Sequence, residues 1–425
     1  MVQRDIGHCS SSSVEVTMKQ RLPMCKVVCS FCERHKEEDE NFFESPRPHG
    51  VIMNGIATHI RICSACAVFA LTKMNPFMSV MMDASNEQRT PEWIETRLSE
   101  AVIGQFEAKR TIAVAAWQHM HRCSLPQSVR DTLPKHNVLI VGPTGTGKTL
   151  MLETLARIIG VPLVTFDASS VTRAGYVGAK AEQCVERLVA AAGSLERAEF
   201  GIIHLDEIDK IRRQNGQSDE VGGEAAQQAF LKILEGITLQ LDGQNFSTKN
   251  ILFVATGAFP DLYEKHAQDT QGGSIGFTTQ RVNTAPLVEA TSEQLTQFGM
   301  IPEFMRRFPS VALMQPLTVY DLEEIIRESS HSPVEQYSKL LDSMGVRTEW
   351  SDDFIQEAAR RAYEKHIGAS GIASVLEHAF RGFLFGLPGF LAEHSHGLAL
   401  TFTSEFLDGA APKYSFDEFA ATASG

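Results

Sequence analysis

The sequence has no run of about 18 apolar residues, the length that a membrane-spanning helix needs, so no membrane association is expected. Its first stretch, MVQRDIGHCSSSSVEV, lacks the apolar core of a signal peptide, which makes the cytoplasm the expected location. Basic residues are outnumbered by acidic ones, 39 to 52, so the formal net charge is -13 at pH 7. Proteins that bind nucleic acid usually present a basic surface, so this balance argues against nucleic acid as a partner.

Apolar residues make up 43% of the chain and charged residues 21%, which is the ordinary range for globular proteins. A chain of 425 residues exceeds a single compact core, so several domains are expected. Shifts in composition divide it into consecutive segments at 1–24, 25–72, 73–90, 91–317, 318–410 and 411–425. We expect the first and last segments to be flexible tails, the second to be a cysteine module and the third to be a linker.

From Pro91 onward, apolar strands alternate with helical stretches. Strands are expected at 137–141, 163–167, 201–205 and 251–256, with helices between them at 148–159, 179–193 and 224–236. This alternation predicts an α/β domain built on a mainly parallel sheet. Beyond Thr318 helical patterns dominate, at 319–330, 332–345, 351–364 and 371–383, with one short strand at 398–402. A second, mostly helical domain is therefore expected.

A phosphate-loop motif follows the strand at 137–141 directly and precedes a helix, a setting that makes a chance match improbable. Its glycines let backbone N–H groups surround phosphates, and the helix N-terminus adds partial positive charge. We expect Lys148 to reach the β- and γ-phosphates and Thr149 to hold Mg²⁺. The predicted nucleotide-binding residues are Gly142, Pro143, Thr144, Gly145, Thr146, Gly147, Lys148, Thr149 and Leu150.

Two adjacent carboxylates, Asp206 and Glu207, end the apolar strand at 201–205. A carboxylate at the carboxyl end of a strand can bind Mg²⁺, and a second one can orient the attacking water. We assign Asp206 to Mg²⁺ and Glu207 to activation of water. The pair alone is weak evidence, because an acidic strand end can simply face solvent. Together with the phosphate loop it predicts nucleotide hydrolysis.

Further motifs, in this order along the chain, resemble the ClpX family of AAA+ unfoldases. They are Val102-Ile103-Gly104-Gln105, Gly175-Tyr176-Val177-Gly178, Gly223-Glu224 with Gln227-Gln228, Ile275-Gly276-Phe277 and the segment 301–307. The stretch ILFVATGAF at 251–259 also fits HslU, a related ring unfoldase, but the cysteine module and the Ile-Gly-Phe tripeptide favour ClpX. The resemblance covers 26–70 and 90–405, and it implies an AAA+ P-loop ATPase with a small helical second domain that uses ATP and Mg²⁺.

The resemblance implies roles for several residues around the nucleotide. Val102 and Ile103 would line the adenine pocket, and Thr256 would sense the γ-phosphate unless its hydroxyl only caps local backbone. Arg307 would act as an arginine finger on a neighbouring subunit's γ-phosphate, with Arg306 as the competing candidate. A finger that acts between subunits requires a closed ring, which the family implies is a homohexamer.

Two loop motifs are expected to contact other proteins. Tyr176 and Val177 lie between glycines, and an aromatic ring there can grip a polypeptide without reading its sequence. A tyrosine that packs locally is the alternative. Ile275-Gly276-Phe277 sets large apolar side chains in a polar segment, which indicates an anchor. The family implies a ClpP-like peptidase as the partner, unless this loop folds back onto its own domain.

Four cysteines form two C-x-x-C pairs, Cys29 with Cys32 and Cys63 with Cys66. In a reducing compartment such pairs indicate metal binding rather than disulfides, and four thiolates suit a tetrahedral structural Zn²⁺. A redox pair or an iron–sulfur site is less favoured, and Cys25 is an alternative ligand. By resemblance, the module would dimerise and collect substrates or adaptors.

The sequence departs from the family at positively charged positions. Two arginines of the family's second domain are replaced by Ser370 and Ala373, and we assign the nucleotide-contacting one to Ala373. Lys365 and His366 are candidates to compensate. Asp219 replaces a basic residue of the second pore loop. A less positive ring entrance predicts substrate tags that depend less on a free carboxylate.

As a whole, the resemblance implies an ATP-dependent unfoldase that threads unfolded or tagged proteins through a hexameric pore. It would deliver them to a ClpP-like peptidase and have no peptidase activity of its own. One alternative is a nucleotide-binding regulatory subunit with weak turnover, because the second-domain arginine is absent. Intact Glu207 argues against that alternative. Another is a protein remodeller that works without a peptidase.

Overall fold

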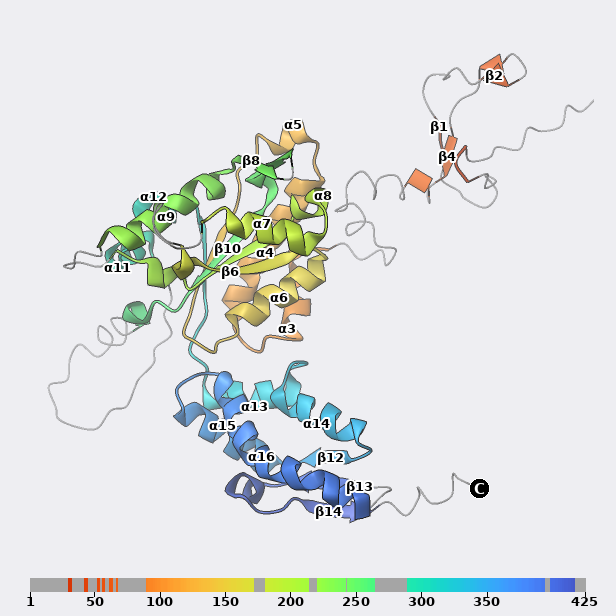
Figure 1. Cartoon of the computed structure of the whole chain (residues 1–425), viewed down its shortest axis with the longest axis vertical. Helices are drawn as coiled ribbons and strands as arrows, with labels where there is room; N and C mark the ends of the chain where they lie inside the picture. Colours follow the sequence, from red (N-terminus) through yellow and green to blue (C-terminus); the bar gives the residue numbers. More distant parts are fainter. Residues whose placement is uncertain are drawn as a thin grey trace, which may run out of the picture. The chain divides into compact units, whose positions relative to one another are not determined.

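The computed structural model describes most of the chain from Arg89 to Phe416 and a few short segments before it. The described ranges are 30–32, 42–44, 52–53, 56–57, 61–63, 66–67, 89–171, 180–213, 220–241, 243–263, 289–393 and 398–416. The chain divides into two compact units, Met1–Met74 and Asn75–Gly425 (Figure 1). Within the described ranges, no helix is both long enough and apolar enough to cross a lipid bilayer.

The first unit contains two short antiparallel strand pairs. β1 (Phe42–Glu44) pairs with β4 (Arg61–Cys63), and β2 (Ile52–Met53) pairs with β3 (Ile56–Ala57). The register of β1 and β4 sets Phe42 opposite Cys63. One predicted metal ligand, Cys63, is therefore held at the end of a strand.

The second unit begins with a five-stranded parallel sheet in the order β11-β5-β10-β7-β6. Its strands are β5 (Val138–Val141), β6 (Leu163–Asp167), β7 (Ile202–Asp206), β10 (Leu252–Gly257) and β11 (Ser310–Leu313). β5 and β10 are buried along their whole length, as expected for strands covered on both faces. The strands at β5, β6, β7 and β10 confirm the sequence-based prediction. β11 was not predicted, because its four residues carry no alternation of their own.

Alternate residues of each strand face opposite sides of this sheet. Leu139 and Val141 belong to one hydrophobic cluster, whereas Val138 and Ile140 belong to another. Helices α7 (Gln183–Ala192), α8 (Leu195–Ala198), α9 (Glu220–Glu235), α11 (Ser292–Phe298) and α12 (Pro302–Met305) contribute to the first cluster. Helices α3 (Pro91–Ser99), α4 (Phe106–Ser124) and α6 (Lys148–Ile159) contribute to the second.

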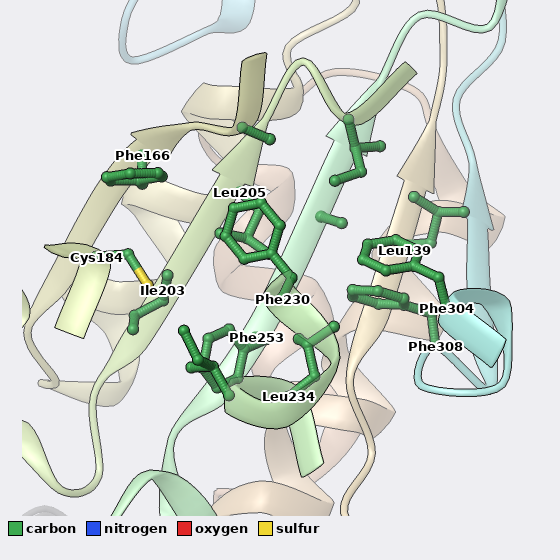
Figure 2. Packing of buried hydrophobic residues seen from close by; sticks show 14 of the residues in the cluster. Leu139, Phe166, Cys184, Ile203, Leu205, Phe230, Leu234, Phe253, Phe304 and Phe308 are labelled. Atoms are coloured by element: carbon green, nitrogen blue, oxygen red, sulfur yellow. The ribbon is translucent and has the colours of Figure 1, made fainter. Parts of the chain in front are cut away.

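Figure 2 shows the first cluster from close by. Phe230 and Leu234 of α9 lie over the strand residues Leu205 and Phe253, and Phe304 and Phe308 lie beside Leu139. The second cluster consists mostly of alanine, aliphatic and methionine side chains, and Phe200 is its one buried aromatic residue. The sheet is therefore a layer between two helical layers, as the α/β prediction requires. Short α5 (Gln127–Arg130) and the hairpin of β8 (Thr238–Leu241) and β9 (Gln244–Ser247) complete this large subdomain, residues 91–317.

The small subdomain, residues 318–416, combines helices with a three-stranded sheet. Its helices are α13 (Val319–Glu328), α14 (Pro333–Ser343), α15 (Asp352–Glu364) and α16 (Ser370–Glu393). Its strands are β12 (Arg347–Trp350), β13 (Leu398–Phe402) and β14 (Lys413–Phe416). β12 runs parallel to β13, and β14 runs antiparallel to it. The core is aromatic, with Phe354, Phe380 and Phe402 fully buried.

Parts of the small subdomain correct the sequence-based prediction. Residues Lys413–Phe416, placed in a flexible tail, form β14 because they pair with β13. The helix expected to end at residue 383 continues to Glu393 through Pro388, and this extension buries Leu387. Packing against the core thus outweighs the low helix propensity of glycine and proline in this stretch.

Candidate functional site

The carboxyl ends of β5, β7 and β10 meet at one edge of the sheet, where a parallel α/β sheet usually binds its ligand. A cavity of about 550 Å³ opens there, which is within the usual range of ligand sites. Its lining residues are Thr144, Gly145, Gly147, Lys148, Thr149, Leu150, Asp206, Glu207, Asp209, Lys210, Gly257, Ala258, Ala369 and Ser370. The structure therefore brings together most of the predicted phosphate loop and both predicted carboxylates.

The phosphate loop turns sharply between β5 and α6. Gly145 and Gly147 have φ values of 77° and 96°, in the left-handed region that favours glycine. The Lys148 ammonium donates to the carbonyl oxygens of Gly142 at 2.6 Å and Pro143 at 2.8 Å. The loop thus folds around its own lysine, and Lys148 is the first residue of α6.

The position of Lys148 affects its protonation. Burial lowers the pKa of Lys148, while the carboxylates of Asp206 and Asp209 act in the opposite direction. A half-buried ammonium at a helix N-terminus, where the first backbone N–H groups have no partner within the helix, suits an anionic ligand. The chemistry of this side of the pocket is therefore that of phosphate binding.

The acidic side of the pocket is held by backbone and hydroxyl donors. Asp206 Oδ1 accepts a hydrogen bond from the Glu207 N–H at 2.9 Å and another from the Thr256 hydroxyl at 2.6 Å. Glu207 has a φ of 56°, a left-handed conformation that is uncommon for a residue with a side chain. Its carboxylate forms an ion pair with Lys210 at 2.6 Å. This backbone turn directs Asp206 and Glu207 into the same cavity.

A buried histidine that the sequence analysis did not single out lies behind this acidic pair. His204 Nε2 lies 2.8 Å from the Thr256 hydroxyl, and His204 Nδ1 lies 3.1 Å from the Thr165 hydroxyl. Burial lowers the pKa of His204 to about 4, although the Asp206 carboxylate opposes the shift. The imidazole is therefore neutral at neutral pH. A polar residue in an apolar strand, two positions before Asp206 and so on the same face, was the signal available in the sequence.

The small subdomain reaches the pocket through backbone and a hydroxyl. The Ala369 N–H donates to the Gly145 carbonyl at 2.8 Å, and Ala369 and Ser370 line the cavity. Ala373 lies elsewhere, in a separate cavity with Tyr337 and Glu377. The sequence analysis assigned the missing nucleotide contact to Ala373. The geometry favours Ser370 for that contact, because Ser370 lines the cavity and Ala373 does not. Lys365, a candidate to compensate, donates to Ser374 at 2.9 Å and is not among the lining residues.

The segment predicted to line an adenine pocket lies next to the phosphate loop. Val102 is buried and lies beside Gly147. The Gln105 side chain forms two hydrogen bonds with the backbone of Gln315, through its Nε2 at 2.9 Å and its Oε1 at 2.8 Å. These bonds tie the start of α4 to the connection between the two subdomains. Val102 is thereby held beside the loop, and Ile103 follows it in the chain.

Arg307 is not among the residues that line the pocket of its own chain. Its guanidinium forms an ion pair with Glu235 of α9, and its carbonyl accepts from the Asn137 side chain at 2.9 Å. The backbone at Arg307 is therefore anchored, while its side chain is held on the surface by Glu235.

Three of the predicted zinc ligands lie together in the first unit. The sulfur atoms of Cys32, Cys63 and Cys66 are all within 4.8 Å of one another, and those of Cys32 and Cys63 are 3.6 Å apart. A tetrahedral zinc with Zn–S bonds of ~2.3 Å requires sulfur atoms ~3.8 Å apart. The three thiols therefore fit such a metal. The fourth predicted ligand, Cys29, lies outside the described residues, as do Tyr176, Val177 and Ile275-Gly276-Phe277.

Comparison with known proteins assigns this arrangement to a class. The family model described as AAA domain (Cdc48 subfamily) matches residues 133–311, which contain the parallel sheet and the phosphate loop. The large subdomain is therefore an AAA ATPase domain.

Whole-length relatives narrow the class to a family. ATP-dependent Clp protease ATP-binding subunit ClpX 3 of Methylococcus capsulatus is 36% identical over 389 residues, which cover 83% of this chain and 88% of the relative. ClpX of Azotobacter vinelandii is 35% identical over 395 residues, covering 85% and 87%. ClpX 2 of Wolinella succinogenes is 33% identical over 384 residues, covering 86% and 92%. The chain belongs to the ClpX family of ATP-dependent Clp chaperone subunits, and it is an ATPase.

Proposed function

We propose that this chain is an unfoldase that uses ATP to thread unfolded or tagged proteins through a homohexameric ring and delivers them to a ClpP-like peptidase. The observation that carries the proposal is the convergence of Lys148, Asp206 and Glu207 on one cavity, in a chain of the ClpX family. Relatives named as ATP-binding subunits of a Clp protease support the peptidase as partner.

In the proposed cycle, Lys148 exchanges the loop carbonyls for the β- and γ-phosphates of ATP. Thr149 and Asp206 line the same cavity and would hold Mg²⁺, a hard cation that prefers oxygen ligands. The ion would supply positive charge to the phosphates there. Glu207 orients the attacking water, and Val102 and Ile103 contact the adenine.

Assembly into a ring is proposed to complete the site. Arg307 lies outside its own pocket and would reach the γ-phosphate of a neighbouring subunit, exchanging its ion pair with Glu235. Tyr176 and Val177 would then face the pore and grip the substrate. The Ile275-Gly276-Phe277 tripeptide would dock on the peptidase.

The first unit is proposed to be a structural zinc module that collects substrates or adaptors. Its ligands are Cys29, Cys32, Cys63 and Cys66, of which the last three already share one cluster. Four thiolates leave no open coordination position, so the metal serves folding rather than catalysis. A reducing cytoplasm would keep these thiols available for the metal.

The experiment is ATP-dependent loss of fluorescence from a folded, tagged reporter, measured with and without a ClpP peptidase. Glu207→Gln should keep nucleotide binding but lose at least ~100-fold in turnover and in reporter unfolding, because the water loses its base. Glu196→Gln, at an exposed glutamate of α8, is the matched control and should behave as the parent. Absence of reporter unfolding by an ATP-hydrolysing parent would contradict the proposal.

Deletion of 275–277 separates the unfoldase from its partner. The deletion should abolish reporter degradation by the added peptidase and leave ATP hydrolysis unchanged. Degradation that survives the deletion would remove the docking role from this tripeptide. Unfolding without any peptidase-dependent degradation by the parent would favour a remodeller that works alone.

A regulatory subunit with weak turnover is the second candidate, and one observation favours it. Ala369 and Ser370 are the small-subdomain residues that line the described cavity, and neither is charged. The pocket thus lacks a guanidinium from that side among the described residues. Slow ATP turnover by a parent chain that binds nucleotide tightly would support this candidate.

A further inference from the structure

Three polar side chains form a line across neighbouring strands behind the acidic end of the pocket. Thr165 of β6, His204 of β7 and Thr256 of β10 connect through contacts of 3.1 Å and 2.8 Å. The side chains of His204 and Thr256 are fully buried. The line ends at Asp206 Oδ1, which the Thr256 hydroxyl contacts at 2.6 Å.

The protons available in this line determine which group donates and which accepts in each hydrogen bond. An ionised carboxylate only accepts hydrogen bonds, so the single proton of the Thr256 hydroxyl points to Asp206. Thr256 Oγ1 must then accept from His204, which places the imidazole proton on Nε2. Nδ1 lies 3.1 Å from the Thr165 hydroxyl, which holds the other side of the ring. From His204 onward, the donors therefore point toward Asp206.

The consequence appears at the carboxylate. Asp206 Oδ1 receives two hydrogen bonds, from Thr256 and from the Glu207 N–H. Oδ2 has no hydrogen bond from the described residues, so it is the oxygen free to bind a cation. Because two hydrogen bonds hold Oδ1, the orientation of the carboxylate is fixed, and Oδ2 would be a fixed ligand for a metal.

We propose that His204 is a positioning residue of the ATPase site, which fixes the Thr256 proton on Asp206 Oδ1 and so reserves Asp206 Oδ2 for Mg²⁺. This inference rests on the proposed assignment of Asp206 to Mg²⁺. It also changes the expected role of Thr256. Its only proton is committed to Asp206, so Thr256 acts on the phosphates through that carboxylate rather than by direct donation.

Two substitutions distinguish the roles of the two imidazole nitrogen atoms of His204. In His204→Gln the side-chain amide can place its N–H where Nε2 stood, so a donor to Thr256 remains. In His204→Asn the shorter amide reaches only the Nδ1 position, so Thr256 loses its donor. Both variants keep a polar side chain of similar size at the same buried place, which makes each the control for the other.

The readout is the affinity for fluorescent ADP, with Mg²⁺ and with a chelator in its place. ADP is not hydrolysed, so the measurement does not depend on turnover. His204→Asn should weaken Mg²⁺-dependent affinity by about 10-fold, the usual effect of removing a residue that orients a metal ligand. His204→Gln should stay within about threefold of the parent. With the chelator, all three proteins should bind equally.

A double substitution tests whether His204 acts on Asp206 through Thr256. Thr256→Val removes the hydroxyl that His204 orients, so adding His204→Asn to Thr256→Val should cause no further loss. Equal weakening by Asn and Gln, or an additional loss from His204→Asn in the Thr256→Val background, would overturn the proposal. Melting temperatures of all variants identify any loss that comes from misfolding. A parent that binds ADP in a Mg²⁺-dependent manner but unfolds no reporter would contradict the proposed function alone.

Discussion

The two subdomains meet at the nucleotide pocket and contribute unlike chemistry to it. The large subdomain supplies the charged side chains Lys148, Asp206 and Glu207. The small subdomain supplies the Ala369 N–H, which donates to Gly145, and the exposed Ser370 hydroxyl. The charged groups that we propose for ATP hydrolysis therefore belong to the large subdomain, while the small subdomain contributes by its position over the phosphate loop. We therefore expect the backbone contact between Ala369 and Gly145 to couple the two subdomains.

Disrupting the contact between Gly368 and Gly145 should weaken this coupling. A Cβ atom on Gly368 would lie 2.5 Å from the Gly145 carbonyl oxygen. Gly368→Ala should therefore lift the small subdomain from the phosphate loop and break the hydrogen bond between Ala369 and Gly145. We expect ATP turnover to fall by about 10- to 100-fold, because small displacements at a reacting site have large effects. Steady-state phosphate release measures this.

Gly345→Ala is the matched control. Both glycines have a left-handed backbone, with φ of 61° at Gly368 and 79° at Gly345. A Cβ atom on Gly345 would meet nothing within 4 Å. The two variants therefore share the conformational strain of about 1–2 kcal/mol, and only Gly368→Ala adds the clash. Equal turnover in both would show that the contact with Gly145 does not couple the subdomains.

The sequence predicted the large subdomain's side of the pocket well, because its residues occur in contiguous motifs. Residues 142–149 form one loop between a strand and a helix, and Asp206 and Glu207 end one apolar strand. His204 escaped prediction because its partners, Thr165 and Thr256, come from other strands. Only the register of β6, β7 and β10 brings these three side chains together.

The small subdomain was harder to predict for a related reason. β12 and β14 are four-residue strands that exist through pairing with β13, and neither has a strong pattern of its own. Ser370 and Ala373 both stand where arginines were expected, yet they are three residues apart at the start of α16 and line different cavities. A motif identifies such positions, but the direction of the helix decides which one faces the nucleotide.

Adding charge to the small subdomain would sharpen the comparison. Ser370→Arg places a guanidinium at the rim of the nucleotide cavity. A charge-assisted contact with a phosphate at this exposed position should add about 1 kcal/mol, or about fivefold in ATP affinity. Titration with fluorescent ATP analogues measures the gain.

Ala373→Arg provides the control for that charge. Its side chain would enter the separate cavity beside Tyr337 and Glu377, so nucleotide affinity should not change. A gain from Ala373→Arg that Ser370→Arg lacks would restore the assignment made from the sequence. It would also show that α16 turns its other face to the nucleotide.

The large subdomain holds two buried histidines, whereas none of the described histidines of the small subdomain is buried. In the large subdomain, burial lowers the pKa of His119 and of His204 to about 4. His119 lies 3.3 Å from the Phe200 carbonyl, and the positive charges of Arg122 and Lys135 also disfavour its protonation. His366 and His378 of the small subdomain are exposed. We therefore expect mild acid to destabilise the large subdomain through its buried histidines.

The sign follows from proton binding. Between pH ~6.5 and ~4 the unfolded chain protonates His119 and the folded one does not, so the free energy of unfolding falls as pH falls. His119→Gln removes this site and keeps a donor for the Phe200 carbonyl. The dependence of unfolding free energy on pH should become shallower by up to ~1.4 kcal/mol per pH unit. Denaturant unfolding across this pH range measures the slope. If the parent and His119→Gln have the same slope, folded His119 takes up its proton as readily as it does in the unfolded chain.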